Sequence, residues 1–252
     1  MEKRTPFIAG NWKMHKTPAQ AAEAARALAA LVDGVAGVEV MIAPTFLSIP
    51  AVAEALAGSS VALGAQNLFW ENEGAYTGEV SGPMLKAAGV RYAIIGHSER
   101  RQYFGETDET VNRRLFAAAA AGLSPVVCVG ETREEREAGK TFSVLDKQVQ
   151  EGLKGWSPRP EAALCVAYEP VWAIGTGLTA TDQQAQEAHA YIRGLLAKML
   201  GRGFADATRI LYGGSVKPGN IAGLMSMPDI DGGLVGGASL DPETFSRIVK
   251  FR

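Results

Sequence analysis

The sequence predicts an α/β protein with a (β/α)8 barrel fold, formed by a single domain over residues 1–252. Two observations support this fold class: eight short apolar runs alternate with helical patterns, and the repeating unit is about 30 residues long. No linker, low-complexity segment or block of charge divides the chain. With 252 residues and 47% hydrophobic content, the chain is long enough to bury one large core.

A doubly wound open sheet is the alternative α/β architecture. It would require a glycine-rich dinucleotide-binding turn after the first strand, and Gly10-Asn11-Trp12-Lys13 lacks that pattern. The strands of the preferred barrel are expected at residues 7–11, 38–43, 61–65, 92–95, 125–129, 162–168, 209–212 and 230–235. Helices are expected after Thr17-Pro18 and at residues 46–57, 108–121, 141–153, 182–200 and 242–250.

Composition narrows the class of protein further. The formal net charge is -2, and no basic stretch is long enough to follow a phosphate backbone, which argues against nucleic-acid binding. Cys128 and Cys165 each lie in an apolar run without metal-ligand spacing, so we expect reduced, buried thiols, no bound metal and a cytoplasmic location. No apolar run reaches the length of about 18 residues that a membrane span needs, so no membrane association is expected.

The sixth apolar run ends at a carboxylate, Glu169, followed by Pro170, bulky apolar residues and Gly175-Thr176-Gly177. Proline stops the strand because it offers no N–H to the sheet, and glycines absorb large backbone rotations. The pattern favours a catalytic base under a movable lid of residues 170–177. A solvated glutamate followed by an ordinary turn remains open at this point.

The first strand brings two polar side chains to the barrel mouth. Side chains alternate along a strand, so Phe7, Ala9, Asn11 and Lys13 share one face. If the small Ala9 faces the barrel axis, Asn11 and Lys13 lie on the same side of the strand and point into the barrel mouth. The catalytic ends of barrel strands are their carboxyl ends, where this pair lies.

The fourth and sixth strands are expected to add a histidine and the glutamate. By the same alternation Ala93 and Ile95 would point inward and His97 would follow them, while the small Ala163, Cys165 and Ala167 would share the inward face with the base. A helix beginning at residues 98–100 would aim its N–H groups at the imidazole, lower its pKa and keep it neutral.

The seventh and eighth strands end in glycine-rich turns, residues 212–216 and 234–239. Without side chains, backbone N–H groups approach a ligand closely, and the loops after these two strands form the usual phosphate site of this fold. A phosphate bound by amides needs no basic cluster, which suits the modest net charge.

The chain resembles the triosephosphate isomerase family over its whole length. The resemblance is carried by Gly10-Asn11-Trp12-Lys13-Met14, Gly96-His97-Ser98-Glu99-Arg100, and residues 167–177, 212–216 and 234–240. It implies a single-domain TIM barrel and an isomerase of glycolysis and gluconeogenesis, which interconverts dihydroxyacetone phosphate and D-glyceraldehyde 3-phosphate through an enediolate without a cofactor. The one departure near these motifs is His15-Lys16, which lies past the catalytic pair.

Carried over residue by residue, the resemblance implies that Glu169 is the base and His97 a neutral electrophile, and that Asn11 and Lys13 contact the substrate. The remaining implied positions are phosphate-binding N–H groups at Gly175, Ser215, Gly236 and Gly237, and a lid of Pro170, Val171, Trp172, Ala173, Ile174, Gly175, Thr176 and Gly177. The role of Glu99 stays open.

The chemistry that the resemblance implies requires a dry site. Ile174 and Leu234 would enclose the base and raise its basicity, and the closed lid would keep the enediolate from expelling phosphate. The long connection at residues 66–79 resembles the family's interdigitating dimer loop, which predicts a homodimer with Thr77 near the partner's site. Self-packing of this loop on its own surface is the alternative.

Two other functions are alternatives for this sequence. A phosphosugar epimerase on the same barrel would share the phosphate turns, but His15, His97 and His189 are too scattered along the chain to form its metal site. A catalytically silent barrel that binds a phosphate ligand would keep the turns and lose turnover. The polar residues retained at the strand ends favour an enzyme over this second alternative.

Overall fold

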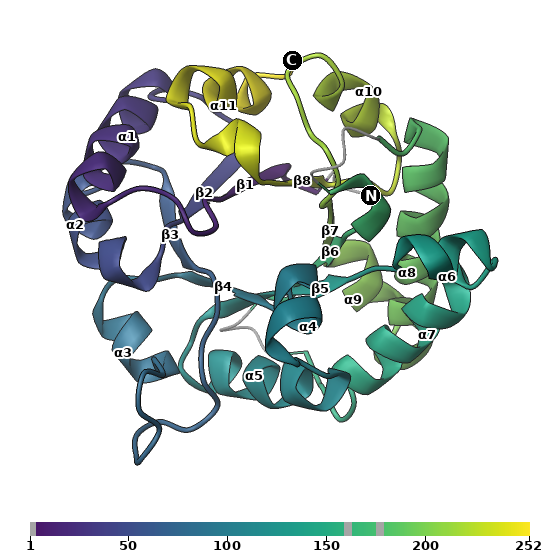
Figure 1. The fold of residues 1–252 in the computed structure, drawn as a ribbon. Coiled ribbons are helices and arrows are strands. Elements are labelled where there is room, and N and C mark those ends of the chain that lie inside the picture. Colours follow the sequence, from purple (N-terminus) through teal and green to yellow (C-terminus); the bar gives the residue numbers. More distant parts are fainter. Residues whose placement is uncertain (1–3, 159–162, 175–178) are drawn as a thin grey trace.

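The structure is a computed structural model that describes residues 4–158, 163–174 and 179–252. Within these residues, parallel strands pair in chain order and the last pairs with the first, which closes a barrel (Figure 1). The strands are β1 (Phe7–Asn11), β2 (Glu39–Ala43), β3 (Ala62–Ala65), β4 (Tyr92–Ile95), β5 (Ser124–Val129), β6 (Cys165–Tyr168), β7 (Arg209–Tyr212) and β8 (Gly232–Val235). The predicted fold class is confirmed.

Helices surround the barrel on the outside (Figure 1). They are α1 (Pro18–Leu31), α2 (Ile49–Ala55), α3 (Gly82–Ala87), α4 (Ser98–Phe104), α5 (Asp108–Ala120), α6 (Arg133–Glu137), α7 (Thr141–Gly152), α8 (Asp182–Leu200), α9 (Arg202–Ala207), α10 (Ile221–Ser226) and α11 (Pro242–Val249), with 3-10 turns η1 (Phe46–Ser48), η2 (Val171–Ala173) and η3 (Gly237–Ser239). The sequence did not predict α3, α6, α9 or α10, because helices of five or six residues are too short to show a clear period.

Two predicted boundaries differ for physical reasons. The helix expected at residues 46–57 is split into η1 and α2, because Pro50 has no N–H to donate to the carbonyl one turn earlier. The last strand begins at Gly232 rather than at residue 230; Gly232 has φ +156, and a Cβ there would lie 1.8 Å from the carbonyl oxygen of Phe7. The first residue expected in the sixth strand, 162, lies outside the described residues, and β6 begins at Cys165.

The barrel interior is filled by one set of alternating side chains. They are Phe7, Ala9, Met41, Ala43, Ala62, Tyr92, Ile94, Val126, Cys128, Cys165, Ala167, Leu211 and Leu234. A larger cluster on the opposite faces of the strands packs against the helices. The inward face expected for the first strand is therefore confirmed, as it is for Cys165 and Ala167 of the sixth, whereas Ala163 lies before β6 and is exposed. The two cysteines are buried, free thiols within the barrel.

The inward face expected for the fourth strand was wrong. Tyr92 and Ile94 point into the barrel, whereas Ala93 and Ile95 pack on the helix side. His97 still reaches the barrel mouth because Gly96 interrupts the alternation with a left-handed backbone angle of φ +69. A Cβ at this glycine would also lie 2.5 Å from the side chain of Val111 on α5.

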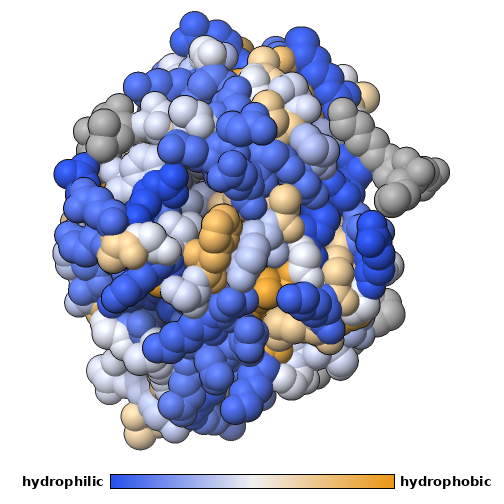
Figure 2. Space-filling view, turned by 90° about the vertical axis from the view of Figure 1, so that its right-hand side faces the viewer, coloured by the Kyte–Doolittle hydropathy of each residue, from blue (hydrophilic) through white to orange (hydrophobic). Residues whose placement is uncertain are grey.

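The surface of the helix layer is mainly hydrophilic. Figure 2 shows this for one face of the molecule, where hydrophilic residues predominate and hydrophobic residues are scattered, the most hydrophobic of them near the centre of the view. The helices thus turn their apolar sides toward the strands, as the large outer cluster requires. In the part of the chain that the structure describes, no helix combines the length and apolar character of a membrane span.

His189 is a fully buried titratable side chain on α8. Its Nδ1 atom lies 2.7 Å from the carbonyl oxygen of Ala185, which can only accept a hydrogen bond, so Nδ1 carries the ring proton. Burial lowers the pKa of His189 from 6.5 to about 4, although the Ala185 carbonyl and the charge of Asp231 act in the opposite direction. The folded protein therefore keeps this imidazole neutral down to mildly acidic pH.

We expect this buried imidazole to make the fold acid-sensitive. Because the folded-state pKa lies below the unfolded-state value, the unfolded chain takes up the proton first, and stability falls as the pH drops from 6.5 to about 4. The loss due to His189 is about 3 kcal/mol across this window. Urea unfolding at several pH values measures it, with His189→Asn as the control. The same pH dependence in both proteins would contradict the assignment.

Candidate active site

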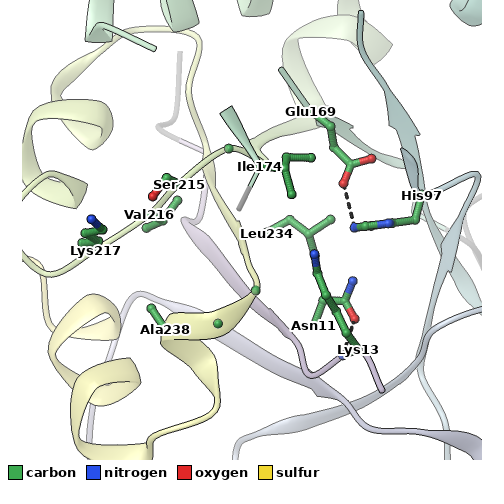
Figure 3. Close-up of a pocket in the computed structure, with 14 residues that line it drawn as sticks. Asn11, Lys13, His97, Glu169, Ile174, Ser215, Val216, Lys217, Leu234 and Ala238 are labelled. Carbon is green, nitrogen blue, oxygen red and sulfur yellow. Dashed lines mark hydrogen bonds and ion pairs between the residues drawn. The ribbon is translucent and has the colours of Figure 1, made fainter. Parts of the chain in front are cut away.

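A cavity of about 280 Å³ opens at the carboxyl ends of the strands (Figure 3). Its walls come from the segments that follow β1, β4, β6, β7 and β8. The lining residues are Asn11, Lys13, His97, Glu169, Ile174, Gly213, Gly214, Ser215, Val216, Lys217, Leu234, Gly236, Gly237 and Ala238. One end of this cavity carries titratable side chains, and the other is built mostly from glycine-rich backbone.

Glu169 and His97 face each other at the deep end of the cavity (Figure 3). The Nε2 atom of His97 lies 2.9 Å from one carboxylate oxygen of Glu169, and the other oxygen accepts a 2.9 Å hydrogen bond from the Ser98 N–H. Glu169 is 2% and His97 5% exposed. A Cβ on Gly213 would lie 2.8 Å from the Glu169 side chain, so a glycine there lets the β7 turn pack against the carboxylate.

The pKa values of this pair shift in directions that the sequence did not predict. Burial alone would raise the pKa of Glu169, but His97, the Ser98 N–H and the Lys13 ammonium lower it below its ordinary value. Burial alone would lower the pKa of His97, but the charge and hydrogen bond of Glu169 raise it. The expected raised glutamate and lowered histidine were wrong for this arrangement, because the two groups touch and each stabilises the charged form of the other.

An N–H group of the α4 N-terminus is nevertheless aimed at the imidazole, as expected. His97 is the N-cap residue of α4, and its Nδ1 atom accepts a 3.2 Å hydrogen bond from the Glu99 N–H. An accepting Nδ1 carries no proton, so the neutral ring has its proton on Nε2, where it is donated to Glu169. This bond favours the neutral imidazole once the carboxylate moves away.

Lys13 is held in an uncommon backbone conformation, with φ 50. Its N–H donates to the Asn11 side-chain oxygen at 3.0 Å, and its carbonyl accepts from the Gln66 amide at 2.8 Å. The ammonium lies 2.5 Å from a carboxylate oxygen of Glu99, so the residue whose role the sequence left open pairs with the cation of the site. These contacts stabilise a left-handed backbone conformation at Lys13, which is unfavourable for a residue other than glycine.

The opposite end of the cavity is formed by the turns after β7 and β8. The second turn leads directly into η3, and the indole N–H of Trp12 donates to the Ser239 carbonyl at 3.0 Å, which ties this turn to the end of β1. Gly213, Gly214, Gly236 and Gly237 leave backbone exposed to the cavity. Such backbone suits an anionic group, with Lys217 at the rim (Figure 3).

A family model for triosephosphate isomerase matches residues 6–252, nearly the whole chain. The chain belongs to the triosephosphate isomerase family. The triosephosphate isomerase of Moorella thermoacetica is 60% identical to it over 98% of this chain and 99% of its own. Those of Citrifermentans bemidjiense and Pelobacter propionicus are 58% and 56% identical, each over at least 98% of both chains.

The structure gathers most of the side chains that the triosephosphate isomerase resemblance assigned to the site. Asn11, Lys13, His97 and Glu169 line the cavity with Ser215, Gly236 and Gly237, and the two apolar residues expected beside the base, Ile174 and Leu234, line it too. Of the lid, Pro170 and the residues from Val171 to Ile174 are described; Gly175, Thr176 and Gly177 lie outside the described residues. Thr77 lies on an exposed loop and does not line the cavity.

Two residues near the cavity were not predicted from the sequence. Lys217 lines the cavity two positions after Ser215, a spacing that the glycine-rich turn could have flagged. Glu131 is completely buried and accepts hydrogen bonds from Tyr168 and from Trp172 in the lid. Its place just beyond the end of β5 was the available signal, but nothing in the sequence shows its partners.

Proposed function

We propose that Glu169, His97 and Lys13 carry out the interconversion of dihydroxyacetone phosphate and D-glyceraldehyde 3-phosphate. The activity itself follows from membership of the triosephosphate isomerase family, and the reaction belongs to glycolysis and gluconeogenesis. The observation that carries the assignment of roles is the buried carboxylate–imidazole pair, with its 2.9 Å contact, at one end of a cavity whose other end is glycine-rich backbone.

Glu169 is the general base of this proposal. It takes a proton from the carbon next to the substrate carbonyl and returns it to the neighbouring carbon, so that the ketose and aldose exchange through an enediolate. To reach the substrate it gives up its bonds to His97 and Ser98, which hold its pKa down. Burial then acts alone and raises its basicity, with Ile174 and Leu234 as the apolar surround.

His97 and Asn11 stabilise the negative charge that develops on the substrate oxygens. His97 has a proton on Nε2, and the Asn11 oxygen is taken by the Lys13 N–H, which leaves the Asn11 amide N–H groups for the ligand. Donors fixed in place before reaction contribute most in a site that excludes water. Lys13, steadied by Glu99, balances the charge of the phosphate and the enediolate.

The backbone N–H groups of Ser215, Gly236 and Gly237 hold the phosphate. The distance between the two ends of the cavity then fixes which carbon meets the carboxylate. Isomerisation by the purified protein, followed in both directions, tests the proposal. A folded protein that binds glycerol 3-phosphate without isomerising either triose phosphate would instead favour the catalytically silent phosphate-binding barrel.

The described part of the lid is attached to the barrel through Glu131. The indole N–H of Trp172 donates to this carboxylate at 2.9 Å, and the Val171 N–H donates to the Glu131 carbonyl at 3.1 Å. The guanidinium of Arg136 lies 4.7 Å from the Trp172 ring and 3.2 Å from the same carboxylate. These contacts define one position of the lid, which we propose closes over the intermediate and suppresses loss of phosphate.

We expect Trp172→Phe to lower kcat/KM about tenfold, because a hydrogen bond to a charged group is lost from one lid position. Release of inorganic phosphate per turnover should rise in the same variant. Both are measured with a coupled isomerase assay and a phosphate assay. Trp156→Phe, which changes a buried tryptophan that does not line the cavity, is the control. Unchanged phosphate release in Trp172→Phe would contradict the role of the lid.

The loop at residues 66–79 supports a homodimer with Thr77 near the partner's site. It projects from the barrel between β3 and α3 (Figure 1). Its aromatic residues are less exposed than the sequence suggested, since Phe69 stacks on Trp70 at 4.1 Å and on Tyr76 at 4.7 Å, but Tyr76 remains 45% exposed. Met14, at 90%, is exposed beside the catalytic lysine, as a covered interface residue would be in a lone protomer.

We expect sedimentation of the purified protein to give about twice the 26.6 kDa chain mass. Tyr76→Glu, which places a charge on the proposed interface, should shift the mass toward the monomer because a buried unpaired charge is costly. Tyr103→Glu, on an exposed residue of α4, tests whether any surface charge has this effect. A parent that sediments as a monomer at micromolar concentration would contradict the dimer.

We also propose a cytoplasmic location. Both cysteines are free and lie inside the barrel, and burial raises the pKa of the Cys165 thiol to about 11. Such thiols suit a reducing compartment, where no disulfide is needed for stability.

A further inference from the structure

His189 lies behind the cavity and takes no direct part in the proposed reaction. It is completely buried, and its unprotonated Nε2 atom makes no hydrogen bond of normal geometry among the described residues; the Leu211 backbone beside the ring would favour only the protonated imidazole. Buried polar atoms without a partner are uncommon, and an apolar residue would fill the same space without that cost. The neighbours of this ring suggest what it does.

Two tyrosine rings pack against His189. Tyr168 and Tyr212 are the last residues of β6 and β7, and they are directly paired in the sheet. Both belong to the outer cluster and face α8, with the Tyr168 ring edge-on to the imidazole at 5.6 Å and the Tyr212 ring at 6.3 Å. A single imidazole thus packs against Tyr168, which precedes the base Glu169, and against Tyr212, which precedes the first glycine-rich turn.

The hydroxyl groups of these tyrosines hold the two sides of the lid. Tyr168 bonds both oxygens of Glu131 at 3.1 Å, and Glu131 in turn accepts from Trp172 inside the lid. Tyr212 accepts a 3.3 Å hydrogen bond from the Ala180 N–H, three residues after the lid. The lid is therefore attached at its start through one tyrosine and just past its end through the other.

The Tyr212 hydroxyl also lies under the phosphate turn. A Cβ on Gly214 would be 2.3 Å from this oxygen, so the glycine allows the turn to rest on the tyrosine. A displacement of the Tyr212 ring would therefore move the lid attachment and the phosphate turn together. On its other side this ring packs against His189 of α8.

We propose that His189 is a positioning residue for the lid, whose imidazole fixes Tyr168 and Tyr212 and thereby both lid attachments at once. The hydrogen bond from Nδ1 to the Ala185 carbonyl, one turn earlier on α8, fixes the plane of the ring. A flexible aliphatic side chain would fill the volume but would not present an oriented flat face to both tyrosines. This inference rests on the proposed function, because the lid matters only if it protects a reactive intermediate.

The test compares His189→Ala with the parent at a temperature where circular dichroism shows both folded. The readout is the ratio of inorganic phosphate released to triose phosphate isomerised, which loss of stability alone does not change. We expect the ratio to rise roughly 3- to 30-fold in His189→Ala, the range of coupling carried by packed side chains. His189→Phe, which keeps a ring between the tyrosines, should recover most of the parent ratio.

Leu196→Ala is the matched control, since this buried residue lies on the same helix about 10 Å further along. It should lower the melting temperature without changing the phosphate ratio. In a double-mutant cycle with Trp172→Phe, the two effects on the ratio should combine to less than their product, because both act through the same lid attachment. His189→Asn, which keeps a donor for the Ala185 carbonyl but loses the ring, serves if the alanine variant does not fold.

The two proposals fail in different ways. A folded parent that does not isomerise triose phosphates would overturn the proposed function. A parent that isomerises, together with ring-less His189 variants that keep the parent ratio, would overturn the positioning role of His189 and leave the function intact. An equal rise of the ratio in Leu196→Ala would likewise overturn it, since any loosening of α8 would then suffice.

Discussion

Replacing Glu169 with glutamine is expected to lower kcat by about 10²–10⁴-fold, the usual contribution of a positioned general base. The amide has nearly the same shape as the carboxylate but cannot take the proton. It can still pack against Gly213 and bond His97 or Ser98, so the fold should be retained. Steady-state isomerisation of D-glyceraldehyde 3-phosphate measures the loss, with KM expected to change little.

Glu169→Asp is the matched variant for this prediction. It keeps the charge and moves the carboxylate back by one methylene, and a displacement of about 1 Å at a reacting group can cost about 10²-fold. Both variants should bind glycerol 3-phosphate about as well as the parent does, because the phosphate end of the cavity is untouched. A Glu169→Gln variant within tenfold of the parent kcat would exclude this residue as the base.

Replacing Lys13 with methionine is expected to lower kcat/KM by about 10²–10³-fold, as the loss of one preorganised electrostatic group does. Methionine keeps much of the side-chain volume and removes the cation. Both KM and kcat should worsen, because the ammonium balances the phosphate charge before reaction and the enediolate charge during it. Initial rates over a range of triose phosphate concentrations separate the two effects.

The control for Lys13→Met is Lys16→Met, a lysine on the same segment whose ammonium lies over the Trp12 ring and outside the cavity lining. It should leave kcat/KM within a fewfold of the parent. Lys13→Met with kcat/KM close to that of the parent would show that the left-handed conformation of Lys13 and its Glu99 contact serve only the structure.

The positions of the site residues along the chain could be predicted because the sequence pattern shows where each strand ends. Apolar runs mark the strands, and the polar residue that follows each run lands at the mouth of a parallel barrel. Asn11, Glu169 and residues of both glycine-rich turns line the cavity, as this pattern predicts. His97 was placed correctly despite a wrong assignment of the inward face, because Gly96 reverses the alternation that the argument assumed.

What the sequence could not show are the contacts between segments far apart in the chain. The pKa shifts of Glu169 and His97 depend on a 2.9 Å approach across 72 residues, which no local pattern reveals. The same holds for Glu131 and Trp172, and for the packing of His189 on two tyrosines. Local patterns report which face a residue occupies, whereas its partners are set by the closure of the whole barrel.

The central claim is that one carboxylate moves a proton between adjacent carbons through an enediolate. Isomerisation of unlabelled D-glyceraldehyde 3-phosphate in D2O, with the product examined by proton NMR, tests it most directly. The account predicts that the dihydroxyacetone phosphate formed carries deuterium at the carbon that receives the proton, since the protonated base exchanges with solvent, and that Glu169→Gln loses this incorporation together with turnover. Product formed at the parent rate with no deuterium on carbon, in the parent and in Glu169→Gln alike, would indicate direct hydride transfer and contradict the assignment of Glu169.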